Sequence, residues 1–336
     1  MTYDTGYIRR GEISRTGFDP GVVRSELAII RDDLHCNAVQ VIGGDPGRLE
    51  LAAGHAADLG LEVWFSPYPL ELSPADILPL FADCAERAER LRDSGAEVVF
   101  VAGVELSIMN QGFMPGDSVD ERLAWLLADP DRRRERLAEV STRLNDFLRS
   151  AVAVVRDRFR GRVTYAAIPA ERVDWAPFDI MSVELIRSAE VAGQFREGVR
   201  SLVAGGKPVA ITGFGTAAYQ GAGDRGGRVM EIIEYDEGTA IPVRLNGHYV
   251  RDEAGQAAYL REVLEVFDTE GVDGTFVFIF ALYGFPHRPA GDPRLDLDMA
   301  SLGIVKMLEG RSGDAYPGMA WEPKAAFTAV AESYRS

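Results

Sequence analysis

The sequence predicts an α/β fold, and within that class a (β/α)8 TIM barrel. Short apolar runs alternate with longer segments of helical period from one end of the chain to the other. A length of 336 residues suits one such barrel with insertions. The main alternative is a doubly wound sheet, but no Gly-x-Gly-x-x-Gly turn follows the first expected strand. We therefore expect residues 1–336 to form a single barrel domain.

The apolar runs are expected to be the strands of the barrel. In chain order they are residues 7–13, 38–42, 61–65, 98–104, 163–168, 180–183, 208–212 and 275–282. The last run is almost wholly apolar, which is typical of a parallel strand that is covered on both faces.

The segments between these runs are expected to be helices, because their apolar residues recur at helical spacing. They cover residues 20–34, 48–59, 74–94, 121–158 and 192–204. Ser73 followed by Pro74 is typical of a helix start, and Gly60 and Gly95 are suitable stops. We expect Asp129-Pro130 to divide the fourth segment into two helices.

The alternation is interrupted after the seventh strand, between residues 215 and 252. Residues 241–250 predict a hairpin that turns at Asn246-Gly247, within an insertion at about 229–252. Because this loop follows a strand of the barrel, it would lie on the catalytic face as a lid or pocket wall. The alternative is a solvent-exposed decoration.

Composition and charge exclude several classes of function. The formal net charge of −16 argues against a nucleic-acid-binding surface and against anionic membranes. No apolar run is long enough to span a membrane, and no signal peptide is evident, so we expect a cytoplasmic protein. The acidic balance suits a neutral or cationic small-molecule substrate better than a polyanion. The sequence does not indicate an oligomeric state.

Neither cysteine nor histidine spacing predicts a metal or cofactor. The two cysteines, Cys36 and Cys84, are expected to be buried free thiols. The histidines stand at positions 35, 55, 248 and 287, without the spacing of metal ligands. No phosphate-binding loop or Gly-x-Ser-x-Gly elbow is present.

Two glutamates that terminate strands are the candidate catalytic residues, because barrel enzymes build their sites at the carboxyl ends of the strands. Glu105 follows the apolar run 98–104, an environment that raises a carboxyl pKa and suits a general acid. The alternative for Glu105 is an ion pair with an arginine at the barrel mouth. Glu184 ends the sixth strand, and Arg187 nearby could simply pair with it.

Further residues near strand ends are candidates for substrate binding: Asp45, Trp64, Glu171, Gly213, Tyr219, Tyr283 and His287. Each has a structural alternative. Asp45 also suits a helix N-cap, Trp64 a core position, and Glu171, beside Arg172 and Asp174, the surface. Tyr283 and His287 lie in a loop that mixes aromatic and polar groups, as carbohydrate-binding pockets do, but packing at the end of the barrel would explain them too.

The chain resembles two groups of proteins. Glu105 after the fourth strand, together with residues 207–215 (Lys-Pro-Val-Ala-Ile-Thr-Gly-Phe-Gly), resembles retaining glycoside hydrolases with a barrel fold. Residues 103–107 (Gly-Val-Glu-Leu-Ser), 173–179 (Val-Asp-Trp-Ala-Pro-Phe-Asp), 286–289 (Pro-His-Arg-Pro) and 296–300 (Asp-Leu-Asp-Met-Ala) are similar to an actinobacterial family labelled "abortive infection protein".

The first resemblance implies that Glu105 is the acid/base residue and that Gly213 replaces the nucleophilic Glu of a Thr-Glu-Phe-Gly pattern. Val104 also departs from the pattern, which has Asn there. Retaining hydrolysis needs two carboxyl groups, and a glycine cannot attack. Either Gly213 is an introduced change that traps substrate, or the natural protein has left hydrolysis behind. Glu184 or Glu231 would then supply a second carboxylate.

Three hypotheses of function follow. The first is an enzyme in which Glu105 acts as general acid/base on a small glycoside or specialised metabolite, by hydrolysis or by a lyase or cyclase step of natural-product biosynthesis. The second is a non-catalytic protein that binds a ligand in the same place. The third, a role in phage defence, comes only from the resemblance to abortive-infection proteins.

Overall fold

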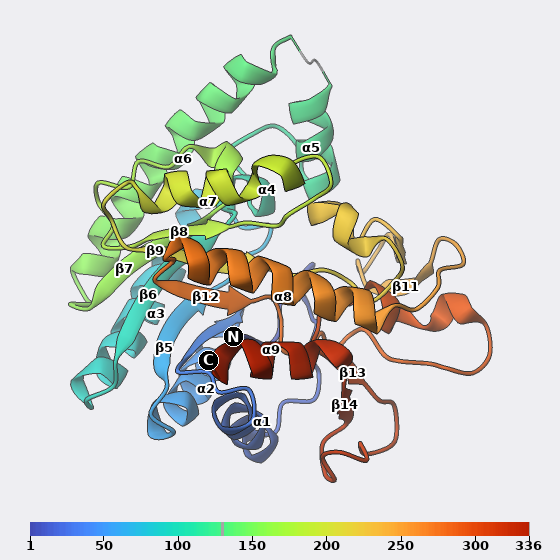
Figure 1. The fold of residues 1–336 in the computed structure, drawn as a ribbon. Helices are drawn as coiled ribbons and strands as arrows, with labels where there is room; N and C mark the ends of the chain where they lie inside the picture. The colour runs from blue at the N-terminus through green and yellow to red at the C-terminus, as the bar shows by residue number, and fades with distance from the viewer. Residues whose placement is uncertain (129–130, 336) are drawn as a thin grey trace.

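The chain forms a parallel eight-stranded sheet that curls into a barrel (Figure 1), in a computed structural model that describes residues 1–128 and 131–335. The strand order is β1 (Thr2–Asp4), β4 (Ala38–Gly43), β5 (Glu62–Pro67), β6 (Val98–Val104), β7 (Arg162–Ala167), β8 (Met181–Glu184), β9 (Val209–Phe214) and β12 (Gly274–Val277). The Phe280 amide donates to the Thr2 carbonyl (3.0 Å), which joins the last segment of the barrel to the first. The predicted (β/α)8 TIM barrel is confirmed.

Helices surround the barrel and bury their apolar faces against it (Figure 1). They are α1 (Pro20–Asp32), α2 (Pro46–Asp58), α3 (Pro74–Asp93), α4 (Leu106–Met109), α5 (Val119–Leu127), α6 (Arg133–Arg156), α7 (Phe195–Val203), α8 (Glu253–Glu270) and α9 (Ala325–Arg335). Ser73 caps α3 by accepting a hydrogen bond from the Asp76 amide, and Gly95 follows its end with φ +102°. The predicted break at Asp129-Pro130 lies outside the described residues. None of the helices within the described ranges is long and apolar enough to cross a membrane.

The barrel strands alternate between an outward and an inward face. On β5, Val63 and Phe65 pack outward in the large core beneath the helices, whereas Trp64 belongs to the apolar cluster inside the barrel. Polar groups also lie among the inward positions: the hydroxyl groups of Thr164 and Ser182 lie 2.7 Å apart. The barrel interior therefore combines apolar and polar side chains.

Two predicted strand assignments are wrong. The first strand is β1, and residues 7–13 form instead a small hairpin of β2 (Ile8–Arg9) and β3 (Glu12–Ile13). Gly6, with φ +118°, ends the strand early, and Gly11, with φ +79°, supplies the turn. The last strand ends at Val277 rather than at residue 282, because the apolar residues that follow are buried in loop conformation over the barrel.

The segment after β9 contains an antiparallel pair, β10 (Ile233–Tyr235) and β11 (Pro242–Leu245). Its turn lies at Asp236, whose carboxylate accepts from the Gly238 and Thr239 amides. The predicted turn at Asn246-Gly247 is wrong. Asn246 instead closes the base of the hairpin, because its amide donates to the Ile232 carbonyl and its side chain to Glu231.

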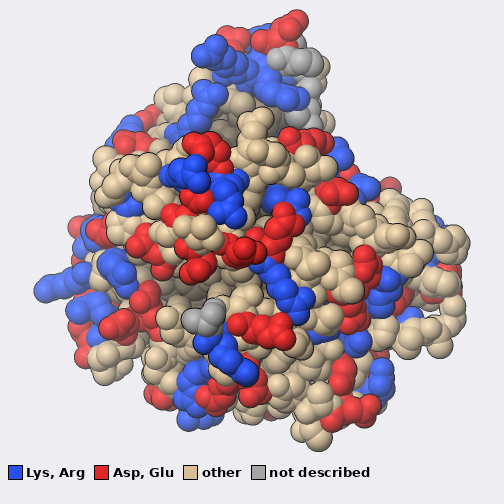
Figure 2. Space-filling view, viewed as in Figure 1, with Lys and Arg blue, Asp and Glu red and all other residues tan. Residues whose placement is uncertain are grey.

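A second antiparallel pair, β13 (Val305–Met307) with β14 (Trp321–Pro323), lies at the same end of the barrel, at the right of Figure 1. The surface over α8 and α9 mixes acidic and basic side chains (Figure 2). Several of them are paired, such as Arg200 with Glu270 and Arg261 with Glu332. Acidic and basic side chains on this face thus neutralise one another in pairs.

Candidate active site

Glu105 stands directly after β6, at the carboxyl end of the barrel, in a left-handed backbone conformation with φ 45°. Its amide donates to the Ala166 carbonyl on β7 (2.9 Å), and the short helix α4 begins at the next residue. A non-glycine residue in this conformation costs on the order of 1 kcal/mol and is held there by its surroundings. Strain of this kind is often found at functional sites.

Glu184 is the last residue of β8, and its carboxylate reaches across to the neighbouring strand β9. The two strands pair so that Glu184 lies opposite Gly213. A Cβ atom at position 213 would lie 1.5 Å from Oε2 of Glu184 and 2.5 Å from its Cδ. The carboxylate therefore fills the space where any side chain at position 213 would begin.

Glycine at position 213 is required by this contact and not by the backbone. Gly213 is absent from the glycines with positive φ, so its conformation suits any amino acid. The β8–β9 register also shifts next to it, between Val183 and Glu184. The absence of a side chain at Gly213, on the seventh barrel strand, thus leaves the room that the carboxylate of Glu184, on the sixth strand, occupies.

The carboxyl groups of Glu105 and Glu184 influence each other. Burial raises the pKa of Glu105 above its usual range, and the carboxylates of Glu184 and Glu171 raise it further. Burial also raises the pKa of Glu184, opposed by the neighbouring Thr212 hydroxyl and reinforced by Glu171. Oε1 of Glu184 is buried and has no hydrogen-bond partner among the described residues. Such a pair favours one protonated and one ionised carboxyl group.

Glu171 is a third buried carboxyl group beside Glu105 and Glu184. Its carboxylate accepts hydrogen bonds from the amide and hydroxyl of Ser107, from Tyr165 and from the Ile168 amide (2.7–3.2 Å). Burial raises its pKa to about 7 in spite of these bonds. Glu171 is only 2% exposed, so the alternative that placed it on the surface is wrong. It holds the segment after Glu105, because Ser107 lies in α4.

Asp4, Tyr7 and Tyr68 also belong to this end of the barrel, and sequence reasoning missed all three. The Tyr7 and Tyr68 rings pack edge to face with centroids 5.1 Å apart. The pKa of Tyr68 is raised by burial and then by Glu105, Glu184 and Asp4, which places it among the carboxylates. Burial raises the pKa of Asp4 to about 7. Recognising that β1 ends at Asp4 would have identified this residue by the rule that found Glu105.

Trp64 and Asp45 have structural roles. Trp64 is 4% exposed, packs against Phe276 with centroids 4.6 Å apart, and donates to Glu62 (2.7 Å). It therefore lies toward the amino end of the barrel interior, away from Glu105. Asp45 is the N-cap of α2 and accepts from the Arg48 amide. For both residues the structural alternative is the one that the contacts support.

Tyr283, His287 and Tyr219 lie in buried contacts of the loops. Tyr283 donates to Glu26 of α1 (2.8 Å), and His287 lies 3.0 Å from Asp296. Tyr219 donates to the Val229 carbonyl at the base of the inserted segment. None of these contacts involves Glu105 or Glu184.

Two other expectations about partners of the glutamates are wrong. Arg187 pairs with Glu262 (3.1 Å) and lies over the Tyr259 ring, so it does not pair with Glu184. Glu231 is exposed and pairs with Arg225 (3.2 Å), which leaves Glu184 as the second carboxylate.

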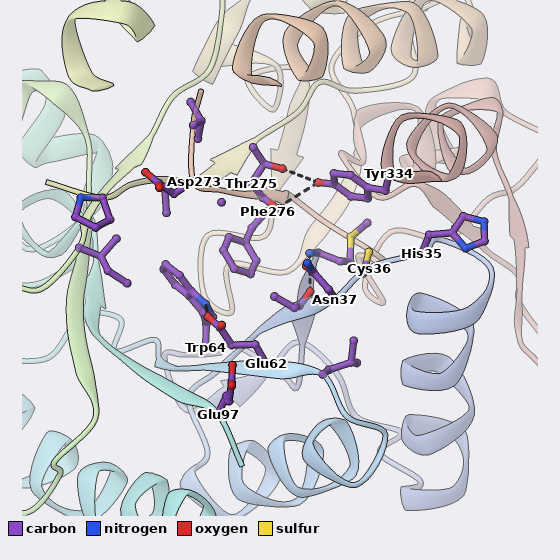
Figure 3. A pocket seen from close by; sticks show the side chains of 18 of the residues that line it. His35, Cys36, Asn37, Glu62, Trp64, Glu97, Asp273, Thr275, Phe276 and Tyr334 are labelled. Carbon is purple, nitrogen blue, oxygen red and sulfur yellow. Dashed lines mark hydrogen bonds between the residues drawn. The ribbon is translucent and has the colours of Figure 1, made fainter. Parts of the chain in front are cut away.

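A cavity of about 1020 Å³ lies at the opposite, amino-terminal end of the barrel (Figure 3). Its walls include the first residues of several strands, such as Ala38, Glu62 and Val209. Trp64 and Phe276 border it from inside the barrel, and Tyr334 bonds to Thr275 beside it. Catalysis in TIM barrels takes place at the carboxyl ends of the strands. We therefore place the candidate active site at Glu105 and Glu184 rather than in this cavity.

No cluster of three histidine, cysteine or acidic side chains within residues 1–128 and 131–335 is arranged to hold a metal ion. Cys36 and Cys84 are buried free thiols, as predicted.

Comparison with solved structures finds glycoside hydrolases of the same fold. A GH113 β-1,4-mannanase matches over 100% of both chains with a TM-score of 0.60 and 15% identity. The GH113 β-mannanase from Alicyclobacillus acidocaldarius matches over 100% of this chain and 96% of its own, with a TM-score of 0.57 and 16% identity. A β-glucuronidase from an uncultured Clostridium species matches 99% of this chain and 49% of its own, with a TM-score of 0.57 and 14% identity. At such identities the likeness shows the barrel fold alone.

No protein-family profile matches the chain, and no curated protein is similar to it in sequence.

Proposed function

We propose that this protein is a glycoside-hydrolase-like barrel enzyme in which Glu105 and Glu184 carry out acid/base chemistry on a small glycoside or specialised metabolite. The observation that carries the proposal is the carboxylate of Glu184 above Gly213. It brings a second acidic group beside the seventh barrel strand, where the retaining hydrolases that the chain resembles bear their nucleophile. The fold of the solved mannanases and glucuronidase supports the same class of chemistry by analogy.

Glu105 is the general acid in this proposal. Because its pKa is raised, it retains a proton near neutral pH and can donate it to the oxygen of a leaving group as the carbon–oxygen bond breaks. The ionised Glu184 stabilises positive charge at the substrate carbon, and the attacking water molecule gives its proton to Glu184 or to the now ionised Glu105. Water adds the hydroxyl group to the carbon, and the second product leaves as an alcohol.

The same pair would serve a lyase or cyclase, in which Glu184 removes a proton from the substrate itself. A non-catalytic binding protein is the other candidate, favoured by the absence of a carboxylate on residue 213. Membership of the abortive-infection family, with a part in phage defence, is a further proposal that rests on the motifs at residues 103–107 and 173–179.

The test is turnover of a panel of aryl glycosides that includes mannosides, glucosides and glucuronides. Glu105→Gln and Glu184→Gln should each lower kcat/KM by at least about 100-fold, the usual contribution of a general acid or base. Glu231→Gln, which removes one exposed carboxylate from the inserted segment, is the matched control and should leave kcat/KM unchanged. Full turnover by Glu105→Gln would refute the proposal, and an inert wild type on every glycoside would favour the lyase or binding alternatives.

A further inference from the structure

The carboxyl end of the barrel holds four carboxyl groups whose pKa values are raised by burial. Asp4, Glu105, Glu171 and Glu184 all lie there, and the charges that act on Glu105 are the carboxylates of Glu184 and Glu171. Four hydrogen bonds satisfy Glu171, which marks it as structural. Of the remaining three carboxyl groups, Glu105 retains a proton in the proposed function, and the ionised Glu184 supplies negative charge at the barrel mouth.

The arginines nearest to this group are engaged elsewhere. Arg15 and Arg48 lower the pKa of Asp4, but Arg15 is 2% exposed and bonds Glu26 (3.0 Å). Arg48 donates to the backbone carbonyls of Thr5 and Arg15. Within the described residues, neither cation forms a hydrogen bond or ion pair with Glu184.

Buried polar atoms without partners line the interior beside these carboxyl groups. Thr212, on the inward face of β9, is 1% exposed, and its hydroxyl lies close enough to Glu184 to lower the pKa of that carboxyl group. Two acceptor atoms have no hydrogen-bond partner among the described residues: Oε1 of Glu184, and Oε1 of Gln40 on β4, a residue that is 2% exposed. Carboxylate and amide oxygens only accept, so a group that donates hydrogen bonds would satisfy these two atoms.

Two aromatic rings complete the surroundings. Tyr7 and Tyr68 meet edge to face, and both interact with Asp4 and Glu184. The faces of such rings attract cations, and the Tyr7 hydroxyl has no partner in the described chain. Acceptors, negative charge and aromatic faces together favour an ammonium group, which has three donors and a positive charge.

We infer that the substrate of this site carries a protonated amine, as an amino sugar or an amine-bearing metabolite does, an inference that rests on the proposed function. The ammonium group lies between Glu184 and the Tyr7–Tyr68 pair and donates to the carboxylate. The negative field of the mouth also attracts such a substrate from solution.

The test is calorimetric titration of the wild-type protein with matched sugars at millimolar concentration. The probes are glucosamine and mannosamine, each compared with its parent sugar and with its uncharged N-acetyl form. We expect each amine to bind at least about tenfold more tightly than its two neutral counterparts, the fold-change given by one charge-assisted hydrogen bond. Neutral forms that bind as well as the amines, or amines that do not bind at all, would overturn the inference.

Variants assign the preference to the site. Glu184→Gln should reduce the amine preference by about tenfold or more, because it keeps the shape and removes the charge. Glu231→Gln is the charge-matched control and should keep the full preference. Equal preference in both variants would overturn the assignment to Glu184. The binding measurement is independent of turnover: loss of activity in Glu105→Gln without an amine preference would retain the proposed function and reject this inference.

Discussion

The contact between Glu184 and Gly213 makes a quantitative prediction for Gly213→Ala. The new Cβ would lie 1.5 Å from Oε2 of Glu184. A comfortable contact is about 3.5 Å, so the carboxylate must retreat by about 2 Å. Because that carboxylate ends a rotatable side chain, we expect the substitution to cost about 1 to 2 kcal/mol in the free energy of unfolding, at the low end of overpacking.

The substitution should be nearly neutral when the carboxylate has already been removed. In a Glu184→Ala background, Gly213→Ala should cost less than about 0.5 kcal/mol, which gives a coupling energy of about 1 kcal/mol. Urea denaturation of the four proteins in the cycle at pH 7 measures this energy. Gly213→Ala should also lower kcat/KM by about 100-fold, since a displacement of this size disrupts reacting geometry. Equal destabilisation in both backgrounds would show that Glu184 does not occupy the space beside Gly213 and would refute the reasoning.

Two further predictions concern the buried carboxyl groups. Burial raises the pKa of Asp4 and Glu171 to about 7 and also raises those of Glu105 and Glu184, so the folded state binds more protons than the unfolded state between about pH 4.5 and pH 7. Their contribution to stability is present below that window and is lost as the pH rises. The Met1 amine has a lowered pKa, so its effect on the pH dependence of stability has the opposite sign, but it is only one group. Urea denaturation should therefore show lower stability at pH 8 than at pH 5. The dependence of stability on pH should be weaker in the Glu105→Gln/Glu184→Gln double variant. A wild-type stability that increases from pH 5 to pH 8 would contradict the raised pKa values of these groups. Glu171→Ala should lower the free energy of unfolding by about 3 kcal/mol, because it leaves the donors of Ser107 and Tyr165 unpaired. The control is Asp174→Ala at an exposed neighbour, which should cost less than about 1 kcal/mol. Equal effects of the two substitutions in chemical denaturation would exclude the buried network.

The sequence was sufficient to predict the barrel and the strands that end at Glu105 and Glu184, because buried parallel strands are marked by continuous apolar runs. It could not show that Glu184 fills the space above Gly213. That contact depends on the register between β8 and β9 and on the irregularity beside it. A bulge of this kind leaves no pattern in a single sequence.

The loop residues were predicted less well for a related reason. Tyr283 bonds to Glu26 across 257 positions of the chain, and the aromatic and polar mixture of its loop serves a buried network. Asp4 and Tyr7 were missed because Gly6 ends β1 after three residues, too short a run to be recognised. Long-range pairing and very short strands are both invisible to local pattern.

The most direct test of the account is a carbon-13 NMR titration of protein labelled at the glutamate carboxyl carbons. The Glu105 and Glu184 resonances can be assigned by their disappearance in Glu105→Gln and Glu184→Gln. We predict that both carboxyl groups titrate above the usual range of glutamate, and that Glu184→Gln lowers the pKa of Glu105 because it removes the neighbouring charge. An ordinary pKa for Glu105 that does not respond to Glu184→Gln would contradict the claim that the two carboxyl groups share one site.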